Sequence, residues 1–216
     1  MKSVELKLKR TIFIKKIKNL FYELFHNDYI ILSSSVSPFF RNWGDDINAV
    51  LPQLINPSIH VIQRKYSFNI KRKKDILCIG SIISWMSTPN SVIWGSGIQF
   101  PEDEILYNGK TIKPRKVLAV RGPLTREYLL QRNIECPEIY GDPALLLPRY
   151  YQPKIKKKYK IGIIPHFKEK NSALVKNLLQ KNEFHFIDIQ YFTNWENLID
   201  EINSCEFILS SSKTST

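Results

Sequence analysis

Arg121 and Asp142 are the polar residues of this sequence whose positions most favour a role in chemistry. Arg121 follows the short apolar run 117–120, which has valine at both ends and is stopped by a Gly-Pro pair, as expected for a buried strand entering a turn. Asp142 lies in a later turn, before an apolar run that ends at Pro148. In βα units, residues just past the carboxyl end of a strand lie at the ligand-binding edge of the sheet. The sequence therefore predicts that both residues lie at such an edge.

A glycine turn is the next candidate. Gly95, Ser96 and Gly97 follow the strand-like run 91–94, and glycine turns can present backbone N–H groups to an anion because glycine allows positive φ and close approach. The turn lacks the third glycine and the acidic residue of a dinucleotide fingerprint, and the chain has no Gly-Lys-Ser/Thr phosphate loop. NAD or ATP binding through those motifs is therefore excluded, and no cofactor is predicted.

Two aspartates and a histidine complete the set of candidates. Asp45 and Asp46 precede a predicted helix over 47–55, where they could act as N-terminal caps. A cap accounts for one aspartate but not for the whole Asn-Trp-Gly-Asp-Asp turn. His166 follows the strand-like run 159–164, and an ordinary loop histidine is its alternative interpretation.

Arg121 and Asp142 have structural alternatives of the same kind. Arg121 could be a surface arginine at the entry to a helix, and Asp142 could be a turn-former before a proline. The sequence leaves these alternatives open.

Apolar periodicity predicts the elements that position these residues. Strand-like runs alternate with helical patterns, which is typical of parallel α/β sheets. The helix over 124–132 is predicted to turn Leu124, Tyr128 and Leu129 inward, and residues 101–113 form an excursion with a turn at Asn108-Gly109. Strands are predicted at 29–32, 75–80, 91–94, 117–120, 159–164, 184–189 and 207–209, and helices at 4–26, 47–55, 124–132, 173–179 and 195–204.

Four segments organise the chain. The sequence predicts a basic amphipathic helix in 1–28, a first Rossmann-like domain in 29–150, a linker in 151–158 and the start of a second Rossmann-like domain in 159–216. The opening helix carries lysines between its apolar positions. It could pack on its own domain or lie on an anionic membrane surface, and both interpretations stay open.

Composition narrows the functional classes. The 216-residue chain has a formal net charge of +12 and a pI of about 9.5, which favours a polyanionic or membrane-surface partner. Much of the excess positive charge lies in short lysine runs typical of solvated linkers. No basic face interleaved with aromatic residues is evident, so nucleic-acid binding is not expected.

The three cysteines are widely spaced and form no C-x-x-C pair, which argues against a disulfide framework or a zinc site and fits a reducing cytoplasm. Cys78 is expected to be a small core residue. The sequence shows neither a signal peptide nor a run long enough to span a membrane. The expected location is cytoplasmic, with peripheral contact at the inner membrane as an open alternative.

Five segments together resemble the polysaccharide pyruvyl transferase family, and they occur in the family's order. The pair Arg-Gly-Pro-Leu-Thr-Arg and Gly-Asp-Pro-Ala-Leu-Leu-Leu-Pro is fairly specific. The resemblance implies two Rossmann-like domains in a GT-B-like arrangement. It also implies transfer of the pyruvyl unit of phosphoenolpyruvate to sugar hydroxyls of a bacterial surface polysaccharide or exopolysaccharide. The matching segments are 42–48, 93–97, 120–126, 140–148 and 161–166.

The resemblance also implies roles for the candidate residues. Phosphoenolpyruvate is a compact trianion, which suits an arginine fork and glycine-turn amides, and protonation of its methylene carbon needs a general acid while the sugar hydroxyl needs a base. Expected partners are phosphoenolpyruvate as co-substrate and a saccharide or lipid-linked saccharide acceptor, with no metal. Substrate contacts are assigned to Asn42, Gly95, Ser96, Gly97 and Arg121, and proton transfer or sugar contacts to Asp45, Asp46, Asp142 and His166.

The end of the chain departs from the family pattern. In the family, a strand like 207–209 is followed by Ser-Ser-x-His-Gly. In this sequence, Lys213 and Thr214 occupy the positions of that histidine and glycine. The comparison predicts a truncated second domain and leaves the activity of this chain open. Two other functions remain as alternatives, a nucleotide-sugar-dependent GT-B-like glycosyltransferase and a non-catalytic fragment.

Overall fold

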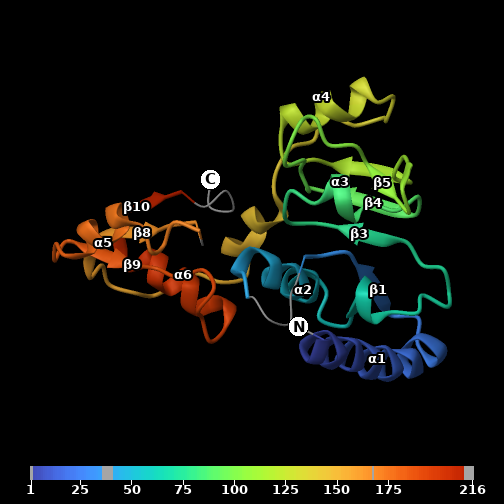
Figure 1. The fold of residues 1–216 in the computed structure, drawn as a ribbon, viewed down its shortest axis with the longest axis horizontal. Helices are drawn as coiled ribbons and strands as arrows, with labels where there is room; N and C mark the ends of the chain where they lie inside the picture. Colours follow the sequence, from blue (N-terminus) through green and yellow to red (C-terminus); the bar gives the residue numbers. More distant parts are fainter. Residues whose placement is uncertain (1, 36–40, 167, 212–216) are drawn as a thin grey trace. The chain divides into compact units, whose positions relative to one another are not determined.

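A computed structural model describes residues 2–35, 41–166 and 168–211, with side chains from residue 9 on. The chain forms two compact units (Figure 1). The first unit comprises Met1–Pro38 and Ile47–Leu147, and the second comprises Phe39–Asp46 and Pro148–Thr216.

Some predicted features lie outside the described residues. They are the part of the expected turn at Phe39 and Phe40, and the tail 212–216, on which the prediction of a truncated domain depends.

A five-stranded parallel sheet forms the centre of the first unit, in the order β2-β1-β3-β4-β7. Ile31, Leu77 and Ile93 are fully buried. Parallel strands covered on both faces have such continuous apolar runs. The strands are β1 (Tyr29–Leu32), β2 (His60–Gln63), β3 (Asp75–Leu77), β4 (Ser91–Trp94) and β7 (Lys116–Ala119).

Helices and a hairpin complete this unit. Asn108 and Gly109 have φ of 52° and 73°, which confirms the predicted turn and closes the β5–β6 hairpin. The helices are α1 (Lys2–Phe25), α2 (Trp43–Ile55, whose first turn clusters with the second unit), α3 (Ile83–Met86) and α4 (Pro123–Gln131); the 3-10 helices are η1 (Arg64–Tyr66) and η2 (Pro143–Arg149), and the hairpin strands are β5 (Leu106–Tyr107) and β6 (Lys110–Thr111).

The inward face of α4 differs from the prediction. Tyr128 and Leu129 are buried as expected, but Leu124 is 82 % exposed and Thr125 is buried in its place. Because Thr125, Tyr128 and Leu129 lie three and four positions apart, they share one face of the helix, and Leu124 lies outside it. The prediction chose the more hydrophobic residue. The structure instead packs Thr125 beside Gly97, where an added Cβ would lie 3.5 Å from Thr125 Oγ1.

The second unit has a three-stranded parallel sheet in the order β10-β8-β9. Asn194 begins helix α6 with a capping box. The core combines Ile164, Ile187 and Leu198 with partly buried Trp43. The elements are β8 (Tyr159–Ile164), α5 (Ala173–Leu179), β9 (Phe184–Phe186), α6 (Trp195–Asn203) and β10 (Cys205–Ser210).

The observed architecture is mixed α/β with parallel sheets, as predicted. In the described part of the chain, no helix is both long and apolar enough to cross a membrane. The GT-B-like arrangement of the two units stays a prediction.

Candidate functional site

The carboxyl edge of the first sheet gathers the loops that follow β3, β4 and β7. Arg121 N donates to Ser96 O at 3.1 Å, and Gly97 N donates to Gly80 O at 2.9 Å. An isolated parallel bridge joins Val120 to Tyr140 beside β7, so the Gly-Asp turn that follows Tyr140 ends at the same edge. The fold thus brings together residues that lie up to about 60 positions apart in the sequence, as expected of parallel sheets.

The guanidinium of Arg121 is held on two sides. Its Nη2 lies 3.0 Å from Oδ2 of Asp142, and its Nη1 donates to Ser81 Oγ at 2.9 Å. The side chains of Arg121 and Asp142 are 28 % and 23 % exposed, and Arg121 Nε is buried without a hydrogen-bond partner. The arginine is therefore fixed in orientation while part of it remains accessible.

Asp142 is engaged through both carboxylate oxygens. While Oδ2 accepts from Arg121, Oδ1 accepts from the backbone N–H of Ala144 at 3.0 Å, at the start of η2. The residue therefore acts both as a turn-former and as the partner of the arginine. This geometry orients Arg121, and because each carboxylate oxygen has two lone pairs, the proton-transfer role of Asp142 stays a prediction.

The glycine turn has a packing explanation. Gly95 has a φ of +86°, and a Cβ there would lie 2.2 Å from Pro143 Cδ and 2.7 Å from Gly141 O. A Cβ at Gly97 would contact the stem of Arg121, 3.4 Å from its Cβ. Only glycine lets these segments approach so closely.

Backbone groups of this turn are largely engaged. The N–H groups of Gly95 and Gly97 donate to backbone carbonyls, and buried Ser96 donates its hydroxyl to Cys78 O at 2.7 Å. The turn therefore contributes shape to the site and positions Arg121.

Buried Cys78 lies beneath this edge. Burial, and to a lesser extent the charge of Asp142, raises the pKa of its thiol to about 12. Cys136 and Cys205 are also buried with free thiols. The prediction that Cys78 is a core residue is confirmed, and the thiol is unsuited to nucleophilic chemistry.

The Asn-Trp-Gly-Asp-Asp turn belongs to the second unit. Asn42 Oδ1 accepts from Gly44 N at 3.0 Å, which makes Asn42 the cap of α2, whereas Asp45 and Asp46 lie in the first helical turn. Asp46 pairs with Arg41 at 3.0 Å. Capping was one of the two roles considered for the aspartates, and in the structure Asn42 performs it.

Trp43 anchors this turn. Its indole donates to Trp195 O at 2.8 Å, and its backbone N–H donates to Ile189 O at 3.0 Å. The large aromatic body is partly buried against the core of the second unit, so the position of the turn is set by packing.

His166 lies where β8 ends. Its backbone N–H donates to Ser211 Oγ at 3.0 Å, and its Nδ1 accepts from Lys168 N at 3.4 Å. Nearby, Lys170 Nζ lies 3.3 Å from Asp188 Oδ2. The carboxyl edge of the second sheet is therefore polar as well.

The structure brings Gly95, Ser96, Gly97, Arg121 and Asp142 to one edge of the first unit. Asn42, Asp45, Asp46 and His166 belong to the second unit. Sequence reasoning missed Ser81 as a partner of the arginine. The available signal was the Gly-Ser pair that ends the apolar run 76–79.

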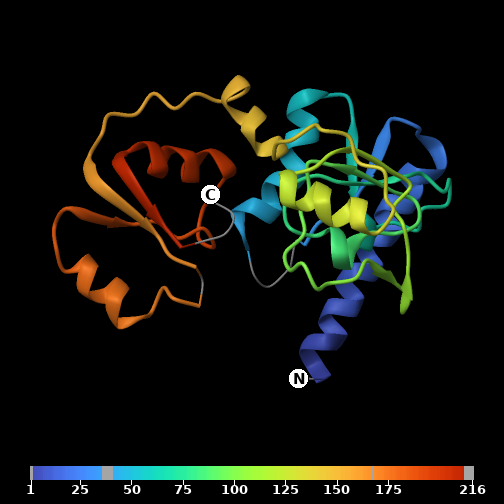
Figure 2. The same cartoon turned by 90° about the horizontal axis from the view of Figure 1, so that it is seen from above.

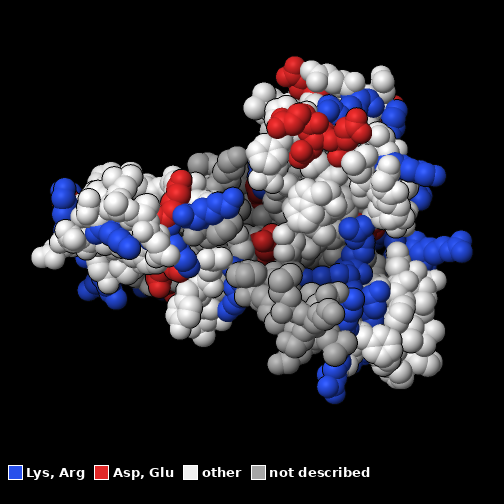
Figure 3. All heavy atoms as spheres, in the orientation of Figure 1, with Lys and Arg blue, Asp and Glu red and all other residues white. Residues whose placement is uncertain are grey.

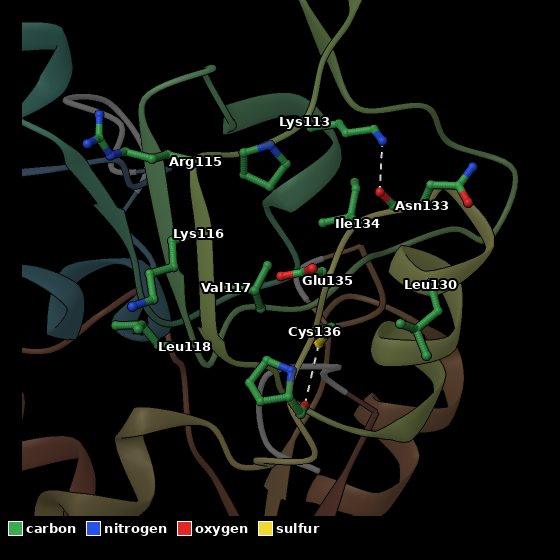
Figure 4. A pocket seen from close by; sticks show the side chains of 12 residues that line it. Lys113, Arg115, Lys116, Val117, Leu118, Leu130, Asn133, Ile134, Glu135 and Cys136 are labelled. Carbon is green, nitrogen blue, oxygen red and sulfur yellow. Dashed lines mark hydrogen bonds between the residues drawn. The ribbon is translucent and has the colours of Figure 1, made fainter.

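A separate hollow of about 740 Å³ lies at the other end of β7 (Figure 4). Lys113, Arg115 and Lys116 line it, and Lys113 Nζ donates to Asn133 O at 2.8 Å. Because these residues precede β7 or begin it, the hollow is distinct from the edge that carries Arg121. Among the described residues, no cluster of His, Cys, Asp or Glu could hold a metal ion.

These features define an α/β protein with an oriented arginine at the carboxyl edge of a parallel sheet. The family model described as "Polysaccharide pyruvyl transferase" matches residues 12–212. The chain belongs to this family, which indicates a transferase. No curated protein and no solved structure matches the chain.

Proposed function

We propose that this protein transfers the pyruvyl group of phosphoenolpyruvate to sugar hydroxyls of a bacterial surface polysaccharide or exopolysaccharide, or of its lipid-linked precursor. Family membership supports the reaction class. The structural observation that carries the proposal is the guanidinium of Arg121, fixed by Ser81 and Asp142 at the carboxyl edge of the first sheet.

An arginine in this state suits a small anion. A guanidinium has five N–H donors in a planar fork, and Ser81 and Asp142 each receive one of those of Arg121. Nε is buried, so the second N–H of Nη1 and that of Nη2 are the donors proposed to bind phosphate or carboxylate oxygens, and charge-assisted bonds of this kind are about twice as strong as neutral ones. The ion pair with Asp142 aligns the fork before substrate binds, which lowers the entropic cost of binding.

The proposed reaction balances without a cofactor. A sugar hydroxyl oxygen bonds to C2 of phosphoenolpyruvate and loses its proton to a base, the methylene carbon takes up a proton from an acid, and the C–O bond to phosphate breaks. A second hydroxyl then bonds to C2 to close the cyclic ketal, and its proton leaves with the phosphate. Arg121 stabilises the charge that develops on the departing phosphate.

Proton transfer needs other groups. Asp45, Asp46, Asp142 and His166 are the candidates for the acid and the base, and Asp142 also holds Arg121 through Oδ2. The proposal includes the GT-B-like arrangement of two Rossmann-like units, a cytoplasmic location and phosphoenolpyruvate as co-substrate.

The test measures phosphate release from phosphoenolpyruvate with and without acceptor saccharides. Release that depends on the acceptor is expected, together with a rise in melting temperature on addition of phosphoenolpyruvate. Arg121→Ala should lower turnover about 100-fold or more, and Arg121→Lys should rescue it poorly because lysine lacks the fork. Arg115→Ala is the matched control, since exposed Arg115 lies before the same strand.

Two results would overturn the proposal. Consumption of nucleotide sugars alone would identify a glycosyltransferase. Absence of turnover and of any melting shift with phosphoenolpyruvate would identify a non-catalytic protein.

A further inference from the structure

Helix α1 packs on the first unit through polar side chains. Glu23 is fully buried, and its carboxylate accepts from Ser67 Oγ and from the backbone N–H groups of Phe68 and Ile70, the latter two at 3.1 Å. A buried carboxylate is stable only with such compensation. The attachment of the helix is therefore specific and polar.

Other inward residues of α1 follow the same pattern. Asn19 Nδ2 donates to Tyr66 O at 2.9 Å. The ammonium groups of Lys15 and Lys16 lie 4.5 Å and 5.2 Å from the ring centroids of Tyr66 and Phe68, as in cation–π contacts. Polar and cationic side chains therefore make many of the contacts between α1 and the rest of the first unit.

Most large apolar side chains in residues 9–25 of α1 point the other way, although Tyr22 packs on the first unit beside Tyr29 and His60. A surface helix normally buries its apolar stripe against the core, yet six large apolar residues of α1 are 45–69 % exposed. They recur at intervals of three and four positions, so they form one continuous stripe, which we call the outer face. The outer face consists of Phe13, Ile14, Ile17, Phe21, Leu24 and Phe25.

Cationic side chains predominate in residues 9–25 of this helix. Residues 9–25 contain five cationic residues and a single acidic one, Glu23, which is buried. At about 100° per residue, Arg10 projects within the outer face and Lys18 at its border. Figure 3 shows uncharged surface over the carboxyl-terminal part of α1, with blue Lys and Arg groups beside it.

We propose that the outer face of α1 inserts into the headgroup region of an anionic phospholipid membrane. An interfacial helix combines an apolar stripe with flanking lysines that reach lipid phosphates, and α1 has both. In Figure 2 its amino-terminal part extends beyond the sheet. At 24 residues the helix is about 36 Å long, and it lies along the surface, since it is not apolar enough to cross a membrane.

A second copy of this chain fits the outer face less well. Pairing two outer faces would bring Arg10 and Lys18 of both copies close together, and residues 9–25 offer no exposed carboxylate to neutralise them. Like charges across a helix pair are destabilising. Anionic lipid supplies the missing negative charge, so charge complementarity favours the membrane.

This inference does not depend on pyruvyl transfer. It concerns a face of the first unit that the candidate site does not use, and membrane binding can be measured without substrate. Failure of one proposal is therefore distinguishable from failure of the other.

The experiment is sedimentation of the full chain with vesicles of phosphatidylcholine mixed with phosphatidylglycerol, compared with phosphatidylcholine alone. Binding is expected to the anionic vesicles and to weaken with added salt. Phe21→Asp should lower the partition coefficient about tenfold or more, because it places a charge within the outer face, which inserts into the membrane. Leu24→Asp, one turn away, is the second variant if Phe21→Asp folds poorly.

Matched controls test whether vesicle binding depends on the outer face rather than on any exposed apolar or cationic residue. Leu124→Asp alters a more exposed leucine of α4 and should bind as the wild type does. Replacing both Arg10 and Lys18 with Gln should weaken binding roughly 25-fold, at about fivefold per cation. The same change at exposed Lys74 and Lys110 should have little effect.

Three outcomes would overturn the inference. They are failure of the wild type to bind anionic vesicles, equal binding by wild type and Phe21→Asp, and a dimer in sedimentation equilibrium that Phe21→Asp dissociates while lipid binding is unchanged.

Discussion

Arg121 Nη2 and Asp142 Oδ2 lie 3.0 Å apart, although 21 positions separate the two residues in the sequence. Strand β7, helix α4 and the returning segment bring them to one edge of the sheet. A second pair in the same unit, Arg126 and Glu138, has nearly the same separation of 3.1 Å, but its glutamate is 73 % exposed. The two pairs allow the role of burial to be measured directly.

Replacement of Asp142 with alanine should destabilise the protein by about 1–3 kcal/mol, because it leaves a partly buried guanidinium without its partner. It should also reduce the melting shift produced by phosphoenolpyruvate, since Arg121 loses its orientation. Glu138→Ala should change stability by less than about 1 kcal/mol, as expected of an exposed ion pair. Urea denaturation measures both, and equal effects of the two variants would show that the inner pair has no special role.

Replacement of Gly95 with alanine should destabilise the first unit by about 3–5 kcal/mol. The new Cβ would lie 2.2 Å from Pro143 Cδ and 2.7 Å from Gly141 O at a φ of +86°, so overpacking adds to backbone strain. Gly109→Ala is the control, since its φ is +73° but no atom lies within 4 Å of the new Cβ.

The control should cost only about 1–2 kcal/mol, which is the strain alone. Differential denaturation of the two variants isolates the close approach of the glycine turn to the Gly-Asp-Pro turn. Similar losses in both would mean that the contact with Pro143 relaxes freely.

Much of the fold was predictable because buried parallel strands leave a strong signal. The apolar runs at β1, β3, β4, β7 and β8 were all identified, as was the Asn-Gly turn. The sequence does not reveal strand β2, because His60–Gln63 is short, lies at the edge of the sheet and has a polar residue at each end. Such a strand is specified by pairing with β1 rather than by its own sequence.

The candidate site was predictable only in part. The position of Arg121 and Asp142 at a strand edge followed from local sequence, but their ion pair and the role of Ser81 depend on how β3, β7 and α4 pack. In the second unit, Asn42 rather than an aspartate caps α2, a choice among several capping residues that propensity does not resolve.

Replacement of Glu23 with alanine should destabilise the protein by about 2–4 kcal/mol, because three donors around it lose their acceptor in a buried setting. The helix α1 should also become more susceptible to trypsin, since this carboxylate anchors it to the loop at Ser67. Glu127→Ala is the control, because Glu127 is exposed on α4 and contacts only Gln131 among the described side-chain hydrogen bonds. Its effect should stay within about 0.5 kcal/mol. Unchanged digestion of α1 in Glu23→Ala would contradict an anchoring role.

His60 should make the packing of α1 sensitive to acid. Burial lowers the pKa of His60 below its usual value of 6.5, although Asp28 opposes this shift, and its ring lies 4.1 Å from that of Tyr22 in α1. Because the pKa is lower in the folded state, the unfolded chain takes up the proton first as pH falls below about 6.5, so stability rises with pH across this window. The melting temperature should therefore drop between pH 7 and pH 5, and His60→Phe, which keeps a ring beside Tyr22, should reduce that drop. An identical pH slope in the variant would mean that other groups cause the acid sensitivity.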